Sequence, residues 1–169
     1  IQNAKDAGPG KIHVSLPSEL NPVLVVRDFG RGMNEEDMRS LLKRVGASSK
    51  RGDVAMAGQL GIGSIAPMSI ADSMTIHSYK DGAVTVLTAW KNDSGDIKLA
   101  ITPAVPSTEL TGTKVSVPVH PELFAQLRDG IRVFQFSPAL CERLVVNGDQ
   151  MVPRARPCSE EVQVGDHRV

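Results

Sequence analysis

Four short segments of the chain carry residue types that could bind a flat ring, an anion or a metal ion. In the first, DFGRGM at 28–33, Asp28 ends an apolar run and precedes two glycines. A carboxylate at a strand end can accept a hydrogen bond from an exocyclic amine such as that of adenine. Gly30 and Gly32 let the backbone pass close to a flat ring, and Met33 can supply an adaptable apolar wall. Taken alone, the segment reads equally well as a glycine-rich turn.

The second segment is GQLGIG at 58–63, which precedes a predicted helix. Glycines that lead into a helix N-terminus expose several backbone N–H groups to an anion, and the helix dipole adds to the attraction. A triphosphate needs this arrangement. The chain contains no GxxxxGK[ST] run, and no strong strand precedes the glycines, so neither a P-loop nor a Rossmann fingerprint is indicated.

The remaining two segments are NAKDA at 3–7 and GTK at 112–114. Asn3 and Asp6 are three residues apart, so they share one face of a helix, and the amide oxygen of Asn3 could bind a magnesium ion that bridges phosphates. Thr113 could place its hydroxyl beside Asp28. Taken alone, NAKDA also fits an ordinary solvent-exposed helix face, and GTK also fits a common way for a strand to begin.

Hydrophobic periodicity predicts the elements that must position these segments. Residues 1–7 fit the end of a helix, and Asn34 caps another that Gly46 ends. The other expected elements are strands over 11–16 and 22–28, a helix over 65–74, strands over 74–80, 83–90, 96–102 and 113–119, an amphipathic helix over 120–134, and a hairpin that turns at 147–148. Helices concentrate early and strands late, which favours an α+β fold with helices over one face of a mixed, mostly antiparallel sheet.

Composition narrows the class of protein further. The 169 residues suit one domain, expected over 1–150, with 151–169 as a polar tail or the start of a following segment. The 19 Lys and Arg balance 19 Asp and Glu, so charge gives no signal for nucleic acid or membrane. Cys141 and Cys158 lack a CxxC spacing, which favours two separate thiols in a cytoplasmic protein over a disulfide. If a phage encodes the chain, the host cytoplasm is expected.

The order of the four segments carries a family resemblance. NAKDA, DFGRGM, GQLGIG and GTK follow one another as the motifs do in the GHKL superfamily, which comprises gyrase, the ninety-kilodalton heat-shock chaperone, histidine kinases and MutL. The chain resembles this superfamily over about residues 1–150. The resemblance implies a two-layer sandwich of the Bergerat type that binds ATP or ADP and Mg²⁺.

The resemblance also implies roles for individual residues. Asn3 would coordinate magnesium, with Asp6 and Ala7 on the same helical motif. Asp28 would bind the adenine amine, partly through a water, in a pocket formed with Gly30, Gly32, Met33 and Thr113. ASSK at 47–50 resembles the lid segment of MutL-type members, and its Ser48, Ser49 and Lys50 would reach the ribose or phosphates. The phosphates would be wrapped by Gly58, Gln59, Leu60, Gly61, Ile62, Gly63 and Ser64.

One expected residue is missing. In members that hydrolyse ATP, a glutamate four residues before the asparagine acts as general base, and that position precedes Ile1. The expected function is therefore an ATP-binding switch domain, closed by a glycine-rich lid, that hydrolyses ATP in the intact protein. A nucleotide sensor without hydrolysis, of the phage rIIA kind, and a histidine-kinase catalytic domain stay open as alternatives. The motifs are closest to the chaperone, MutL, MORC and rIIA side. A homodimer formed through the lid or through regions outside the chain is also implied.

Overall fold

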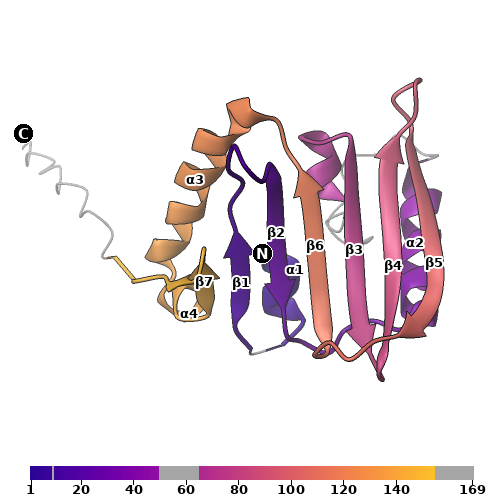
Figure 1. The fold of residues 1–169 in the computed structure, drawn as a ribbon, viewed down its shortest axis with the longest axis horizontal. Coiled ribbons are helices and arrows are strands. Elements are labelled where there is room, and N and C mark those ends of the chain that lie inside the picture. The colour runs from indigo at the N-terminus through magenta and orange to yellow at the C-terminus, as the bar shows by residue number, and fades with distance from the viewer. Residues whose placement is uncertain (9, 50–64, 155–169) are drawn as a thin grey trace, which may run out of the picture.

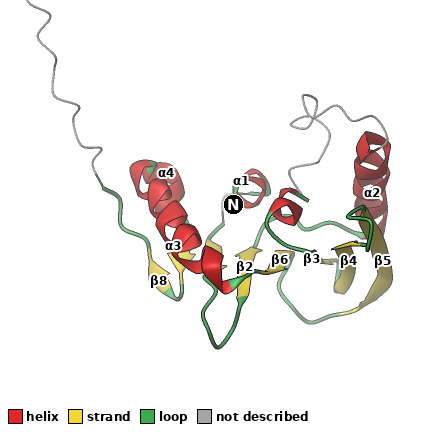
Figure 2. Ribbon diagram, turned by 90° about the horizontal axis from the view of Figure 1, so that it is seen from above, coloured by secondary structure: helices red, strands yellow, loops and turns green. Residues whose placement is uncertain are grey.

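The computed structural model describes residues 1–8, 10–49 and 65–154. They form one eight-stranded sheet whose helices all lie on the same side (Figures 1 and 2). The strands are β1 (Ile12–Ser15), β2 (Val23–Asp28), β3 (Ser73–Lys80), β4 (Ala83–Lys91), β5 (Ile97–Pro106), β6 (Gly112–Pro118), β7 (Leu144–Val146) and β8 (Asp149–Gln150). The helices are α1 (Gln2–Asp6), α2 (Glu35–Ser49), α3 (Phe124–Arg132) and α4 (Pro138–Cys141), with 3₁₀ turns η3 (Ala66–Ser69), η4 (Pro121–Leu123) and η5 (Val133–Phe136).

The sheet is mixed but mostly antiparallel. Its strand order is β5-β4-β3-β6-β2-β1-β7-β8. Only the pairing of β1 with β7 is parallel among the described strands. β2 and β6, which carry two of the predicted motifs, are neighbours in the interior of the sheet although they are far apart in sequence. The predicted α+β class, with helices over one face, is confirmed.

Two tight turns follow the chemistry that hairpins require. Asp81 and Gly82 between β3 and β4 have φ values of 55° and 72°, and Asn147 and Gly148 between β7 and β8 have 52° and 94°. Both pairs occupy the left-handed region that a two-residue hairpin turn uses, which favours Asn, Asp and Gly. The hairpin predicted at 147–148 is therefore confirmed.

Helix α2 begins as predicted but ends later. Asn34 Oδ1 accepts from the Asp37 N–H at 2.8 Å, and Asp37 Oδ2 accepts from the Asn34 N–H at 3.1 Å, which is a reciprocal cap. The prediction that Gly46 ends the helix was wrong, because α2 continues to Ser49. A single helical glycine costs only about 1 kcal/mol relative to alanine, and no proline follows to stop the helix.

The helix predicted over 65–74 was also wrong. Only one 3₁₀ turn, η3, forms there, and β3 begins at Ser73. Met74 pairs with Ala89 on β4 and is fully buried. A ten-residue segment is too short to hold a helix without tertiary support, so sheet pairing and burial of Met74 decide the outcome.

Two clusters of buried side chains form the core between the sheet and the helices. One lies under η3 and α2 and includes Met38, Met74 and Leu87. The other lies under α1 and α3 and includes Ile12, Ile131 and Leu144. The clusters meet at Leu24, which packs against both. A cavity lies in the space between the two clusters.

Candidate functional site

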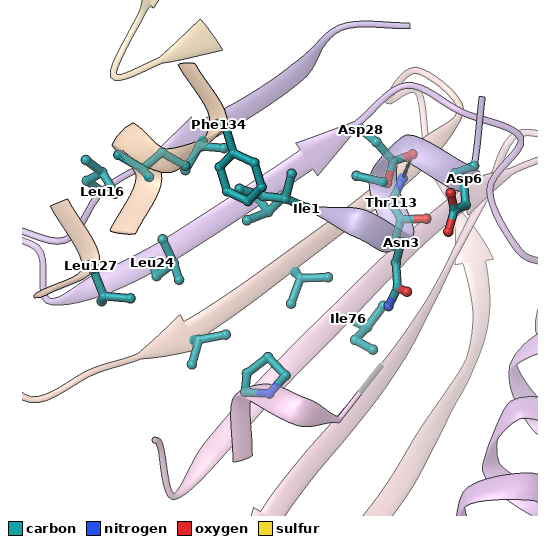
Figure 3. Close-up of a pocket in the computed structure, with 18 of the residues that line it drawn as sticks. Ile1, Asn3, Asp6, Leu16, Leu24, Asp28, Ile76, Thr113, Leu127 and Phe134 are labelled. Atoms are coloured by element: carbon teal, nitrogen blue, oxygen red, sulfur yellow. Dashed lines mark hydrogen bonds between the residues drawn. The ribbon is translucent and has the colours of Figure 1, made fainter. Parts of the chain in front are cut away.

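A cavity of about 540 Å³ lies between the two clusters, on the helix-covered side of the sheet. This volume falls within the range typical of sites for small molecules. Its walls are mainly apolar, and Figure 3 shows Asn3, Asp6, Asp28 and Thr113 gathered at one end of it. The apolar lining comes largely from strand residues that alternate toward the helices and from α3 and η5: Val14, Leu16, Leu24, Val26, Ile76, Val115, Val117, Leu127, Ile131 and Phe134.

Asp28 is the buried carboxylate of this cavity. It is the last residue of β2 and only 7% exposed. Its Oδ1 accepts from the Gly30 N–H at 3.0 Å and from the Thr113 N–H at 3.2 Å. Two backbone donors thus fix the carboxylate in place, and its Oδ2 has no hydrogen bond to any described residue. A fixed acceptor on a cavity wall suits a ligand that offers an N–H donor.

Two glycines allow the strands and the turn to meet around Asp28. Gly112 has φ 136°, and a Cβ there would lie 2.2 Å from the carbonyl oxygen of Asp28. Gly32 has φ 60°, and its Cβ would lie 2.3 Å from the Tyr79 carbonyl oxygen. Side chains rarely adopt these backbone conformations, and neither space would admit one. Glycine at both positions is therefore a requirement of the site's backbone.

The turn after Asp28 is held on both sides. The hydroxyl of Ser78, which is fully buried on β3, accepts from the Met33 N–H at 2.6 Å. On the other side, the Arg31 N–H donates to the Ala7 carbonyl at 3.2 Å. The turn therefore joins the sheet to the carboxyl end of α1, and Gly32 and Met33 line the cavity.

Helix α1 places Asn3, Asp6 and Ala7 on the cavity, so the predicted shared face is confirmed. The helix has only five residues and cannot hold itself. Arg143 holds its carboxyl end: Nε donates to the Gly10 carbonyl at 3.0 Å, Nη1 to the Lys5 carbonyl at 3.4 Å, and Nη2 to the Gly8 carbonyl. A guanidinium at a helix carboxyl end is also favoured by the helix dipole.

Not every predicted residue lines the cavity. Gly30 packs against α1 instead, because a Cβ there would lie 2.5 Å from the Ala7 carbonyl oxygen. Ser48 and Ser49, expected in a lid loop, belong to the last turn of α2. Lys50 and the whole run 58–64 lie outside the described residues.

Sequence reasoning missed two parts of the site. The first part is the apolar half of the cavity, under α3. The strands that line it alternate apolar and polar residues like any core strand, so their sequence does not distinguish a cavity wall from an ordinary packed core. Arg143 lies more than 130 residues from the carbonyls that it binds, and no pattern near it marks such contacts. Both depend on which elements become neighbours.

The described helices and the cysteines bear on the expectation of a cytoplasmic protein. None of the described helices is both long and apolar enough to cross a membrane. Cys141 is fully buried, and that burial, with Glu142 as a lesser cause, raises the pKa of its thiol. Cys158 lies outside the described residues.

Comparisons with known proteins agree with this geometry. Residues 1–115 match the family described as histidine kinase-, DNA gyrase B-, and HSP90-like ATPase. The chain is 30% identical to the chaperone protein HtpG of Ehrlichia ruminantium (strain Gardel) over 136 residues, which cover 72% of this chain and 21% of that protein. It is 30% identical to the DNA mismatch repair protein MutL of Sinorhizobium medicae over 125 residues, 69% of this chain and 19% of MutL.

A third similar protein is the putative type II restriction enzyme HgiDII of Herpetosiphon aurantiacus, at 30% identity over 130 residues, 68% of this chain and 21% of HgiDII. The chain thus spans about a fifth of the length of each of these relatives.

Proposed function

Because the chain belongs to the histidine kinase-, DNA gyrase B- and HSP90-like ATPase family, we propose that its cavity binds ATP, with the adenine at Asp28 and the phosphates toward α1. Family membership supports ATP binding in general. The orientation rests on one observation, the buried carboxylate whose Oδ1 is fixed by two backbone donors while Oδ2 has no partner among the described residues.

The proposed contact with the base predicts that the cavity discriminates between adenine and guanine. Adenine offers an exocyclic amine, which donates to a carboxylate, whereas guanine offers a carbonyl oxygen at the same ring position and would face Asp28 acceptor to acceptor. Leaving a buried polar group without its partner costs about 1–3 kcal/mol, and more for a charged group. The cavity should therefore favour ATP over GTP. Met33, Ile76 and Val115 supply apolar walls for the base.

The proposed phosphate end lies at α1. Asn3 and Asp6 present oxygen atoms, which Mg²⁺ prefers, and Mg²⁺ usually takes only one or two protein ligands beside substrate phosphates. No group of three or more His, Cys, Asp or Glu that could hold a metal ion occurs among the described residues. We therefore expect Mg²⁺ to bind together with the nucleotide, with Asn3 as a ligand. When bound, it would neutralise phosphate charge.

Two further parts of the proposal concern a lid and hydrolysis. ATP would close a glycine-rich lid over Ser48 to Gly63, and closure would create a surface for a partner. Hydrolysis would use a glutamate four residues before Asn3. The alternative is a nucleotide sensor without turnover. Phosphate release distinguishes the two when it is measured on a version of the chain that carries a glutamate four residues before Asn3, because only the first predicts turnover that a substitution at that glutamate removes.

The test of the binding proposal is calorimetric titration of the chain with ATP, ADP, adenosine and GTP, with and without magnesium. Asp28→Asn keeps an oxygen for the two backbone donors but replaces the free oxygen by an NH₂ group. We expect this variant to stay folded and to lose roughly a hundredfold in ATP affinity, because one hydrogen bond to a charged group contributes about 1.5–3 kcal/mol and the new NH₂ faces a donor.

Asp129→Asn is the matched control, because Asp129 is exposed on α3 and pairs only with Arg132 at 3.2 Å. It should bind ATP like the wild type. Normal ATP binding by Asp28→Asn, or equal affinity of the wild type for ATP and GTP, would contradict the proposed orientation.

A further inference from the structure

The side of the sheet opposite the helices carries a row of basic side chains. Among the described elements, no helix covers this side (Figures 1 and 2). The strand register aligns His13 on β1 with Arg27 on β2, Arg27 with Lys114 on β6, and Lys114 with His77 on β3. We call these four residues, on four adjacent strands, the cationic row, after the lysine and arginine at its centre. At the usual spacing of strands the row spans about 14 Å.

Strand alternation assigns the row to this open side. Successive side chains of a strand point to opposite faces of the sheet. Each member of the row is preceded or followed by a residue that lines the cavity on the helix-covered side, namely Val14, Asp28, Thr113 and Ile76. The row itself therefore faces away from the cavity, and none of its members lines it. A site on the row is separate from the proposed nucleotide site.

The row has no counter-ion among the residues that the structure describes. No ion pair among the described residues involves any of its members. The described strands contain only two carboxylates, Asp28 and Asp149. Asp28 lines the cavity, and Asp149 pairs with Val146, which is opposite the cavity-lining Val14. The chain as a whole has no net charge, so the row reflects a local segregation of charge.

Arg27 is fixed at the centre of the row. Its guanidinium carbon lies 4.9 Å from the ring centre of Phe29 and 4.5 Å from that of Tyr79, and Nη2 donates to the Leu110 carbonyl. His13 meets the Phe29 ring edge-on at 5.2 Å. A fixed cation loses little freedom when it binds an anion. Arg27 covers one face of each ring, so that face is closed to a stacking nucleic-acid base.

Apolar side chains flank the row on the same side. Val25 lies two residues before Arg27, and Val86 is opposite His77. Trp90, which is opposite Ser73, is 39% exposed. Val25 and Val86 are half-buried. Cations bordered by partly exposed apolar side chains complement a polypeptide with carboxylates and apolar side chains.

We propose that the cationic row is a docking surface for an acidic, extended segment of a partner protein. Carboxylates of the segment would pair with Lys114 beside the positive charge of Arg27, whose Nη1 is itself buried, and its apolar side chains would pack on Val25 and Val86. The proposal does not depend on nucleotide binding, because the surface and the cavity lie on opposite faces of the sheet.

Fluorescence anisotropy on the whole chain tests it. The probe is a labelled ten-residue peptide in which pairs of glutamates alternate with pairs of valine or serine residues, so that each side of the extended chain carries both kinds. The comparison probes are the same peptide with glutamine for glutamate and a ten-nucleotide oligothymidylate. We expect the glutamate peptide to bind in low salt, more weakly at 0.5 M salt because ion pairs are screened, and the glutamine peptide not to bind. Lys114→Glu should weaken peptide binding at least about tenfold, since it replaces a positive charge at the centre of the row by a negative one.

Lys43→Glu is the matched control, because Lys43 is exposed on α2, over the other face of the sheet. It makes the same change in net charge and should leave peptide binding unchanged. Lys114→Gln, with thermal unfolding of all variants, guards against a Lys114→Glu protein that fails to fold. No binding of the glutamate peptide, an equal loss in Lys43→Glu, or oligothymidylate binding that matches the peptide and depends on Lys114 would each overturn the proposal.

Discussion

The two faces of the sheet carry side chains of opposite charge. The helix-covered face buries one carboxylate, Asp28, whose partners among the described residues are backbone donors. The open face carries Arg27 and Lys114, and no described strand places a carboxylate on that face. Arg27 and Asp28 are adjacent in the chain, yet alternation sends them to opposite sides. One pair of strands, β2 and β6, can therefore position a buried acceptor for a small molecule and half-buried cations for a larger partner.

The largest effect should follow from breaking the backbone that holds Asp28. Gly112→Ala places a Cβ 2.2 Å from the Asp28 carbonyl oxygen at φ 136°, so the β2–β6 pairing must shift. We expect the free energy of unfolding to fall by at least about 3 kcal/mol, measured by urea denaturation.

Gly130→Ala is its control, because a Cβ on that helical glycine meets nothing within 4 Å. It should stabilise the protein by about 0.5–1 kcal/mol. Equal stability of the two variants would show that the close approach at Gly112 relaxes without cost.

The second effect concerns the phosphate end of the cavity. Arg143→Gln removes a guanidinium that binds three backbone carbonyls around the end of α1. We expect roughly a tenfold loss in affinity for magnesium–ATP and a smaller loss for adenosine, because one charged hydrogen-bonding group contributes about 1.5–3 kcal/mol and α1 carries Asn3 and Asp6 but not Asp28. Calorimetry with both ligands measures the difference.

Arg132→Gln, at an exposed pair with Asp129, should leave both affinities unchanged, since surface pairs contribute at most about 1 kcal/mol. A parallel loss of ATP and adenosine affinity in Arg143→Gln would mean that the residue supports the fold in general and has no selective effect on α1.

A third test separates the two faces. Arg27→Lys keeps the charge of the open face but loses the contacts with Phe29 and Tyr79 and the bond to Leu110. We expect unfolding to become easier by about 1 kcal/mol, while ATP affinity stays within about twofold because the side chain points away from the cavity. A large loss of ATP affinity would show that the faces are coupled through β2.

The smallest effect is a dependence on pH. Burial, with the nearby Lys114 as a lesser cause, lowers the pKa of His77 below its ordinary value of 6.5, and its buried Nδ1 has no hydrogen-bond partner in the described part of the chain. The unfolded chain then binds the proton more tightly than the folded one. The stability due to neutral His77 is full above pH 6.5 and is lost as pH falls through that value toward the lowered pKa.

Urea midpoints between pH 8 and pH 5 should therefore decline more in the wild type than in His77→Gln. Identical declines in the two proteins would assign the pH dependence to other groups.

Local chemistry explains which parts of the fold were predictable. The cap at Asn34, the turn at Asn147 and the strand carrying Asp28 each depend on residues within a few positions of one another, and all three form as predicted. The end of α2 was predicted too early because a single helical glycine costs too little to stop the helix. The helix predicted over 65–74 does not form because pairing in the sheet outweighs the local helical pattern.

The sequence by itself determined the order of the motifs, hence the family, and the face of α1 that carries Asn3 and Asp6, because periodicity within one element is a local property. Only the tertiary structure decided that β6 lies beside β2, that Arg143 holds the end of α1, and that four basic side chains from β1, β2, β6 and β3 align in one row. Register and neighbourhood follow from how the whole sheet pairs and packs, and residues distant in sequence carry no local record of that choice.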